Sequence, residues 1–187
     1  MRLDGSRRLR NPESSNMNAD KMRLALELVG VNVRRQFELL RKENADVLRH
    51  AGLPEEAQQF FEEFSFDQDL TIGELYYDQA NCFKKNLDWD DSFQRALRSN
   101  LLLIGSGSTG DPIALDLSDY QVGYLFHDYF WEQEEENSRK FLIKMNCSVG
   151  EFFWNALTIE EYPVDAYAAA EYMNAEFTGY WNPEKDN

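Results

Sequence analysis

The sequence predicts an α+β fold, a single domain in which helices, including a long N-terminal helix, flank a central antiparallel sheet of about four to six strands. Three short apolar runs, bounded by Gly, Ser and Asp residues, indicate consecutive strands at Leu101–Ile104, Ile113–Leu117 and Val122–Phe126. Helical patterns precede and follow this block rather than alternating with strands, which is typical of an antiparallel sheet. A length of 187 residues fits one domain.

The segment before the predicted sheet divides into an arm and two helices. Residues 1–18 are rich in Arg, Ser and Asn without apolar periodicity, and we expect a flexible arm followed by a domain over 19–187. Residues 20–49 predict one amphipathic helix, because apolar side chains recur near the 3.6-residue period and Gly52 follows as an end signal. Those apolar side chains are Leu26, Val29, Val33, Phe37, Leu40 and Val47. Pro54 begins the next helix, whose aromatic face we expect in the core.

The remaining elements are predicted from their own local signals. Apolar or weakly alternating runs indicate an edge strand before the central block and a fourth strand after it, and a short helix leads into the sheet. These elements are Thr71–Tyr77, Lys140–Met145 and Asp90–Arg98. Ser148, with Glu151 at the third helical position, matches a capping box and predicts a helix over Val149–Leu157. Asp165 is the predicted cap of a last helix, Ala166–Phe177.

The charge of the chain is large and uneven. The formal net charge is −15, but residues 1–50 hold eleven Lys and Arg against seven Asp and Glu, a net +4, so the remainder carries −19. Such a body repels nucleic acid and anionic membrane surfaces, and we expect neither as a partner. It attracts a basic protein surface and speeds association with it. The alternative is that the excess acid only keeps the protein soluble.

The loop between the first two central strands spells a literal G-x-G-x-x-G, at Gly105–Gly110. A dinucleotide fingerprint needs a helix directly after the glycines, whereas Pro112 and an apolar strand follow here. A phosphate-binding P-loop ends in Gly-Lys-Ser/Thr, whereas this loop continues with Asp111. The pattern therefore favours a hairpin loop, and we expect no cofactor.

No cluster of residues predicts a catalytic or metal site. Cys82 and Cys147 have no C-x-x-C spacing and are expected to be buried, reduced thiols. The acidic run that begins at Asp88 lacks the Gly and Glu positions of a calcium loop. His127 and Asp128 form the one candidate acid–base pair, but neighbours on a strand end point to opposite faces, which favours a structural histidine. We therefore expect no enzyme activity.

An acidic strip with interleaved aromatic residues follows the third central strand. We expect it to join acids of the neighbouring loops in one negative surface, which would contact a partner through carboxylates and aromatic anchors. The candidate contact residues are Asp111, Asp116, Asp119, Asp128, Trp131, Glu132, Glu134, Glu135 and Glu136. Tyr120, Tyr124 and Tyr129 lie among them. The alternative is a solvated turn beside a core strand.

Five segments carry a family resemblance through their order and spacing. Three lie in the predicted strands: Ile104–Ser106, the Gly110–Pro112 start of a strand with Asp116, and Val122–Asp128. Two lie in predicted helices, Leu53–Phe64 and Ser148–Leu157. Together they resemble the SUKH superfamily over about residues 50–160. That superfamily includes bacterial immunity proteins of polymorphic toxin systems and a fungal regulator of cell-wall glucan synthesis, and it offers no catalytic motif to transfer.

The resemblance implies a non-catalytic protein-binding module, an immunity protein that neutralises a toxin by covering it with an acidic surface. A nuclease with a basic active site is the toxin class that fits. The alternative is an intracellular regulator or adaptor, and a third hypothesis is an enzyme or ligand-binding protein with a deep pocket beside Gly105–Asp111. The start of the chain does not resemble a signal peptide and Leu24–Val33 is too short to cross a bilayer, so we expect the cytoplasm.

Overall fold

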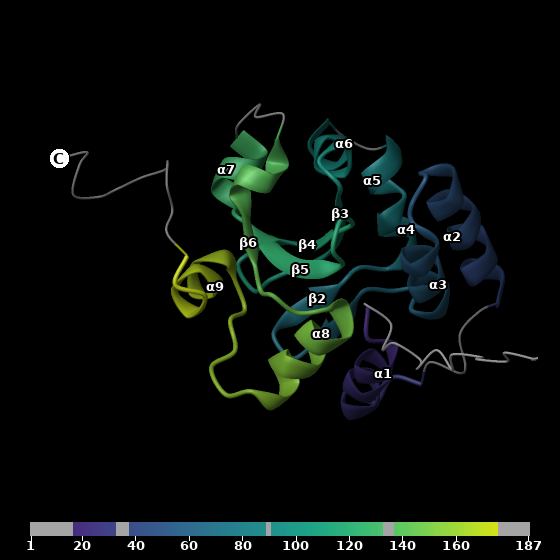
Figure 1. Cartoon of the computed structure of the whole chain (residues 1–187). Helices are drawn as coiled ribbons and strands as arrows, with labels where there is room; N and C mark the ends of the chain where they lie inside the picture. Colours follow the sequence, from purple (N-terminus) through teal and green to yellow (C-terminus); the bar gives the residue numbers. More distant parts are fainter. Residues whose placement is uncertain (1–16, 33–37, 89–90, 133–136, 176–187) are drawn as a thin grey trace, which may run out of the picture.

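The computed structural model of the chain describes residues 17–32, 38–88, 91–132 and 137–175 (Figure 1). Its six strands are β1 (Leu70–Ile72), β2 (Leu75–Tyr77), β3 (Leu101–Ser106), β4 (Pro112–Asp116), β5 (Gln121–Leu125) and β6 (Leu142–Lys144). The helices before β3 are α1 (Ala19–Leu28), α2 (Glu38–His50), α3 (Glu55–Glu63), α4 (Ala80–Phe83), α5 (Lys85–Asp88) and α6 (Asp91–Arg98). Those after β5 are α7 (His127–Glu132), the 3₁₀ helix η2 (Ser138–Phe141), α8 (Val149–Thr158) and α9 (Ala166–Tyr172).

All six strands form one antiparallel sheet in the order of the sequence, from β1 to β6. The β3–β4 ladder runs from Leu101 opposite Asp116 to Ser106 opposite Pro112, with one irregularity between Leu103 and Gly105. Neighbouring strands are also neighbours in sequence, so the sheet needs no crossover connection. The predicted α+β class and the antiparallel sheet are confirmed.

Both faces of the sheet are buried at β3 and β4, which explains why these two strands are apolar at nearly every position. On one face Leu102 and Ile104 belong to the large core that α1, α3, α8 and α9 cover. On the other face Leu101 and Leu103 pack with Phe130 of α7 in a smaller core that α6 also covers. Successive strand residues alternate between faces, so one apolar strand serves two cores. Figure 1 shows α6 and α7 on one side of the sheet and α8 on the other.

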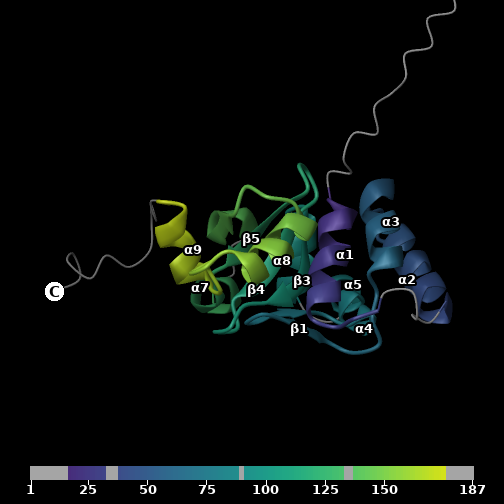
Figure 2. The ribbon, with the colours of Figure 1, turned by 90° about the horizontal axis from the view of Figure 1, so that it is seen from below.

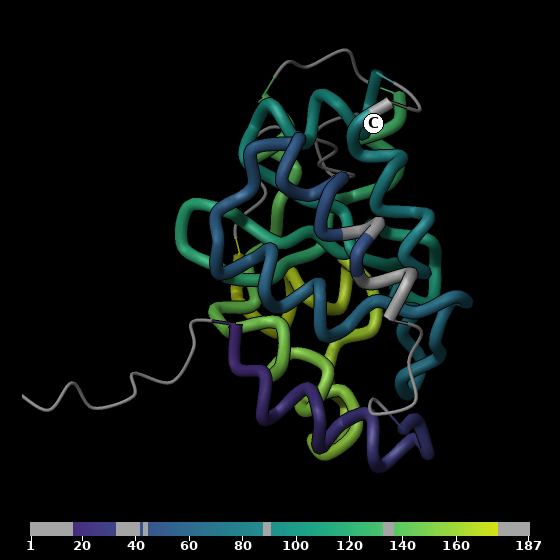
Figure 3. The backbone as a smooth tube through the Cα atoms, turned by 90° about the vertical axis from the view of Figure 1, so that its right-hand side faces the viewer, coloured from purple at the N-terminus to yellow at the C-terminus, as the bar shows by residue number. Residues whose placement is uncertain are grey.

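The prediction of one long N-terminal helix over 20–49 is wrong. The first helix ends at Leu28, and Gly30 follows in the left-handed region at φ 77°. The N–H groups of Gly30 and Val31 donate to the carbonyls of Glu27 and Leu26, which closes the helix end. The chain then leads to α2, which lies beside α3, whereas α1 lies beside α8 (Figures 2 and 3).

Most of the other predicted elements are present with altered bounds. The predicted edge strand Thr71–Tyr77 is the β1–β2 hairpin, because Gly73 takes a left-handed conformation in its middle. Most of the predicted strand Lys140–Met145 lies in η2 and the shorter β6. The capping box of Ser148 and Glu151 is confirmed at the start of α8. Asp165 caps α9, which ends at Tyr172 rather than at Phe177.

The predicted arm over 1–18 lies outside the described residues except for its last two positions. Met17 is fully buried and its carbonyl accepts a hydrogen bond from Gly150 at 3.0 Å, while the side chain of Asn18 caps α1. Met17 and Asn18, the last two residues of the predicted arm, are therefore part of the packed domain. Within the described ranges, no helix combines the length and the apolar composition that a membrane crossing needs.

Candidate partner-binding face

Helix α7 carries the exposed part of the predicted acidic strip. Asp128 and Trp131 are 50% and 42% exposed, and Glu132 is also exposed. Phe130 is fully buried in the smaller core and fixes the opposite side of the helix. Residues three and four apart share one side of a helix, so Asp128, Trp131 and Glu132 form one surface, which we call the α7 face.

Asp128 is held in place by two neighbours. His127 Nε2 lies 2.9 Å from Asp128 Oδ1, and the Tyr167 hydroxyl donates to Asp128 Oδ2 at 3.1 Å. The expectation that His127 and Asp128 point to opposite faces is wrong, because α7 begins at His127 and the backbone there is helical rather than extended. Tyr167 was missed by the sequence analysis, although its place two residues after the cap Asp165 puts it in the first turn of α9.

Asp111 supports the α7 face from inside the protein. Its carboxylate is fully buried and accepts hydrogen bonds from His127 N (3.0 Å), His127 Nδ1 (2.7 Å), Ala166 N (2.8 Å) and Thr109 Oγ1 (2.9 Å). The placement of Asp111 on a partner-binding surface is therefore wrong. Instead, it connects the glycine loop to the first residues of α7 and α9. The hydrogen bond with Asp111 raises the pKa of His127, although burial of the ring acts in the opposite direction.

The inward-facing part of the Trp131 ring packs against two aromatic side chains. Its ring centroid lies 5.7 Å from that of Phe93 in α6 and 4.5 Å from that of Phe130, the latter in an edge arrangement. These contacts limit the rotation of the indole while part of its surface stays exposed. A large, rigid aromatic side chain of this kind loses little conformational entropy when a partner binds.

Asp116 is also buried rather than exposed, so its predicted surface role is wrong. Arg139 binds it with two nitrogens and Lys144 Nζ lies 2.7 Å from it. Burial alone raises the pKa of a carboxyl, but hydrogen bonds from Arg139, Lys144 and Ser118 outweigh it and hold the pKa of Asp116 far below its usual range. Asp119 is 42% exposed and pairs with Lys144 at 2.6 Å. This cluster therefore neutralises its own charge, unlike the α7 face.

The last three predicted contact residues, Glu134, Glu135 and Glu136, lie outside the described residues. Of the nine candidates, the structure brings together Asp128, Trp131 and Glu132 on one helix. It places Asp119 at the turn after β4, paired with Lys144. The α7 face is therefore the described part of the predicted surface that remains acidic and exposed.

Backbone carbonyls accept hydrogen bonds from three N–H groups of the glycine loop. The N–H groups of Gly107 and Gly110 donate to the carbonyls of Asp111 and Gly107, and that of Ser108 donates to Val164. A phosphate-binding loop offers such N–H groups to phosphate, whereas these three already have acceptors. The loop joins β3 to β4 as a hairpin, as the sequence predicts.

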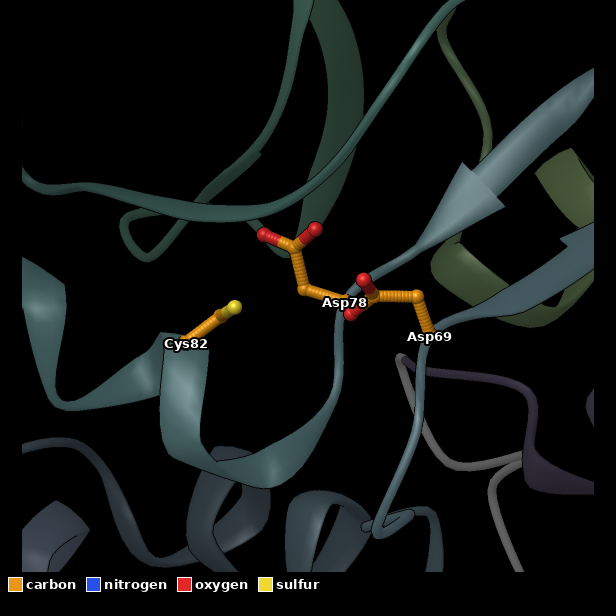
Figure 4. A group of neighbouring side chains, drawn as sticks. All are labelled: Asp69, Asp78 and Cys82. Atoms are coloured by element: carbon orange, nitrogen blue, oxygen red, sulfur yellow. The ribbon is translucent and has the colours of Figure 1, made fainter.

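A second acidic group lies at the other end of the sheet. Ligand atoms of Asp69, Asp78 and Cys82 all lie within 4.8 Å of one another, and Figure 4 shows them converging from the ends of β1 and β2 and from α4. Burial, and then Asp69, raises the pKa of Asp78 to about 6, and burial and Asp78 raise the pKa of Cys82. Both shifts favour the protonated carboxyl and thiol, and a metal ion would have to displace these protons before it could bind. Lys85 also adds a positive charge nearby, which disfavours a cation. We therefore assign no metal to this group.

Comparisons with protein-family models, with curated proteins and with solved structures find no match to this chain. The resemblance to the SUKH superfamily therefore rests on the five segments of the sequence.

Proposed function

We propose that this chain is a non-catalytic protein-binding module, an immunity protein that neutralises a basic toxin. The observation that carries the proposal is the α7 face, where Asp128 stands one helical turn before Trp131 and Glu132 and all three are exposed. Acid for charge pairing and a fixed aromatic side chain for contact area are the two features that an interface with an Arg- and Lys-rich surface needs. The resemblance to the SUKH superfamily supplies the immunity role.

The proposed mechanism is occlusion. A body with an excess of negative charge steers a basic partner into contact, and the acidic side chains then occupy the positions that substrate phosphates take in a nuclease. Both thiols are free in the structure, which suits the reducing cytoplasm in which an immunity protein would meet its toxin.

The surroundings of His127 favour binding over acid–base chemistry. Nδ1 lies 2.7 Å from Asp111 and Nε2 lies 2.9 Å from Asp128, so each ring nitrogen already faces a carboxylate. A general base needs one nitrogen directed at the nucleophile whose proton it removes. In this arrangement His127 instead connects the buried Asp111 to the exposed Asp128.

The test is affinity capture with the full chain, carried out in parallel with the double variant Asp128→Lys/Glu132→Lys and the control Glu171→Lys. Glu171 is an exposed acid on α9. We expect one stoichiometric basic partner that is released at high salt, is lost from the double variant, is kept by the control, and kills cells when expressed alone. A captured partner without toxicity would instead favour the regulator. A binding affinity that is the same at low and high salt and the same for the double variant would exclude the acidic face as the interface.

A further inference from the structure

We propose that the α7 face is a receptor for one arginine side chain of the partner, which stacks on Trp131 while Asp128 and Glu132 accept its N–H groups. This inference rests on the proposed function and names the chemistry of its central contact. The proposed ligand of the face is a guanidinium group rather than any positively charged group.

The helix geometry places the three side chains within reach of one planar cation. Asp128 precedes Trp131 by three residues and Glu132 by four, so its carboxylate lies between the indole and the second carboxylate on the surface of α7. A guanidinium is flat and carries five N–H donors in a rigid fork, so it can lie on an aromatic ring and still bind carboxylates at its edge. A lysine ammonium is a compact, strongly hydrated charge and gains less from such a site.

Two of the three side chains, Asp128 and Trp131, are fixed before a partner arrives. Asp128 is held by His127 at 2.9 Å and by Tyr167 at 3.1 Å, and Trp131 packs on Phe93 and Phe130. Little side-chain freedom remains to be lost on binding, which is the property of interface residues that dominate affinity. The exposed fractions of Asp128 and Trp131, 50% and 42%, leave each a surface that a ligand can cover.

The same chain contains a related arrangement in which a cation lies on the tryptophan. In α8, Glu151 precedes Trp154 by three residues, as Asp128 precedes Trp131 in α7. Lys21 of α1 lies over the Trp154 ring with Nζ 4.5 Å from its centroid, and its charge lowers the pKa of Glu151 together with the larger effect of the Ser148 hydrogen bonds. A tryptophan three residues after an acid thus holds a cation from another element inside this fold, and the α7 face repeats that spacing at the surface.

The experiment titrates hexa-arginine and hexa-lysine peptides into the full chain and follows the backbone N–H signals of α7 and the indole N–H of Trp131 by NMR. We expect hexa-arginine to shift the signals of Asp128, Trp131 and Glu132 and to bind about tenfold more tightly than hexa-lysine at the same salt. Trp131→Leu and Asp128→Asn/Glu132→Gln should each remove this preference. The second variant leaves the aromatic packing intact, so the test does not depend on how Trp131→Leu folds, and Glu171→Gln is the control for one lost charge.

Equal binding of the two peptides, or shifts spread over the acidic surface without Trp131, would overturn the arginine receptor. These outcomes differ from failure of the proposed function. If the captured partner is lost from Asp128→Lys/Glu132→Lys but binds Trp131→Leu normally, the face binds a basic partner without an arginine receptor. If the partner binds the double charge-reversal variant as tightly as the wild type, the acidic face itself is not the interface.

Discussion

Replacing the buried Asp111 by Asn tests how the α7 face is supported. Each carboxylate oxygen of Asp111 accepts two hydrogen bonds, Oδ1 from the N–H and Nδ1 of His127 and Oδ2 from Ala166 N and Thr109 Oγ1. An Asn side chain keeps one acceptor oxygen and turns an NH₂ group toward two of these donors. The variant therefore leaves one backbone N–H, of His127 or of Ala166, without its acceptor. The exposed Thr109 hydroxyl can turn to water, and a neutral His127 Nδ1 can itself accept a hydrogen bond.

The expected loss of stability follows from these contacts. A buried donor left without an acceptor costs about 1–3 kcal/mol, so one such N–H predicts a loss of about 2 kcal/mol. For a protein of 187 residues this corresponds to a fall in Tm of roughly 4–8 °C. Asp111 also raises the pKa of His127, so the variant should return that pKa toward its usual value.

Urea unfolding and an NMR titration of His127 measure the two effects. The folded-state pKa of His127 is raised, so the stability that its protonation contributes is full below the unfolded-state pKa, and it is lost as the pH rises through the folded-state pKa. The difference between wild type and Asp111→Asn should therefore be larger at pH 6 than at pH 9. Glu171→Gln, at an exposed position, should change stability by no more than about 0.5 kcal/mol. A loss below about 1 kcal/mol in Asp111→Asn with an unchanged His127 titration would refute this role of Asp111.

Two further predictions concern other parts of the fold. Asp78→Asn should stabilise the protein at pH 7 by about 1–3 kcal/mol. The folded-state pKa of Asp78 is raised to about 6, so the wild type loses stability as the pH rises from about 4 through this value, whereas an Asn side chain does not ionise. Urea unfolding at pH 4 and pH 7 measures this, and a variant less stable than wild type at pH 7 would contradict it. Gly150→Ala should destabilise the protein by about 1–3 kcal/mol, although Ala favours helices, because its Cβ would collide with the carbonyl of Asn18 where α1 crosses α8. Thermal unfolding checks the sign, and a higher Tm would show that α1 can move away freely.

Local signals were sufficient wherever a few consecutive residues decide the structure. The apolar runs between turn-forming residues predicted β3, β4 and β5, and the Ser148 capping box predicted the start of α8. The break after α1 was also signalled locally by Gly30, but the apolar period continues through it. The decision between one helix and two depends on what each half packs against, since α1 lies on α8 and α2 on α3.

The sequence by itself determined the antiparallel α+β architecture, the hairpin role of the glycine loop and the concentration of acid after β5. Only the tertiary structure decided which acids are exposed. Asp111, Asp116 and Asp128 look alike in sequence, yet the first two are buried because His127, Ala166 and Arg139 reach them from later parts of the chain. A carboxylate can be buried only when such donors surround it, and no local pattern reports where distant donors will lie.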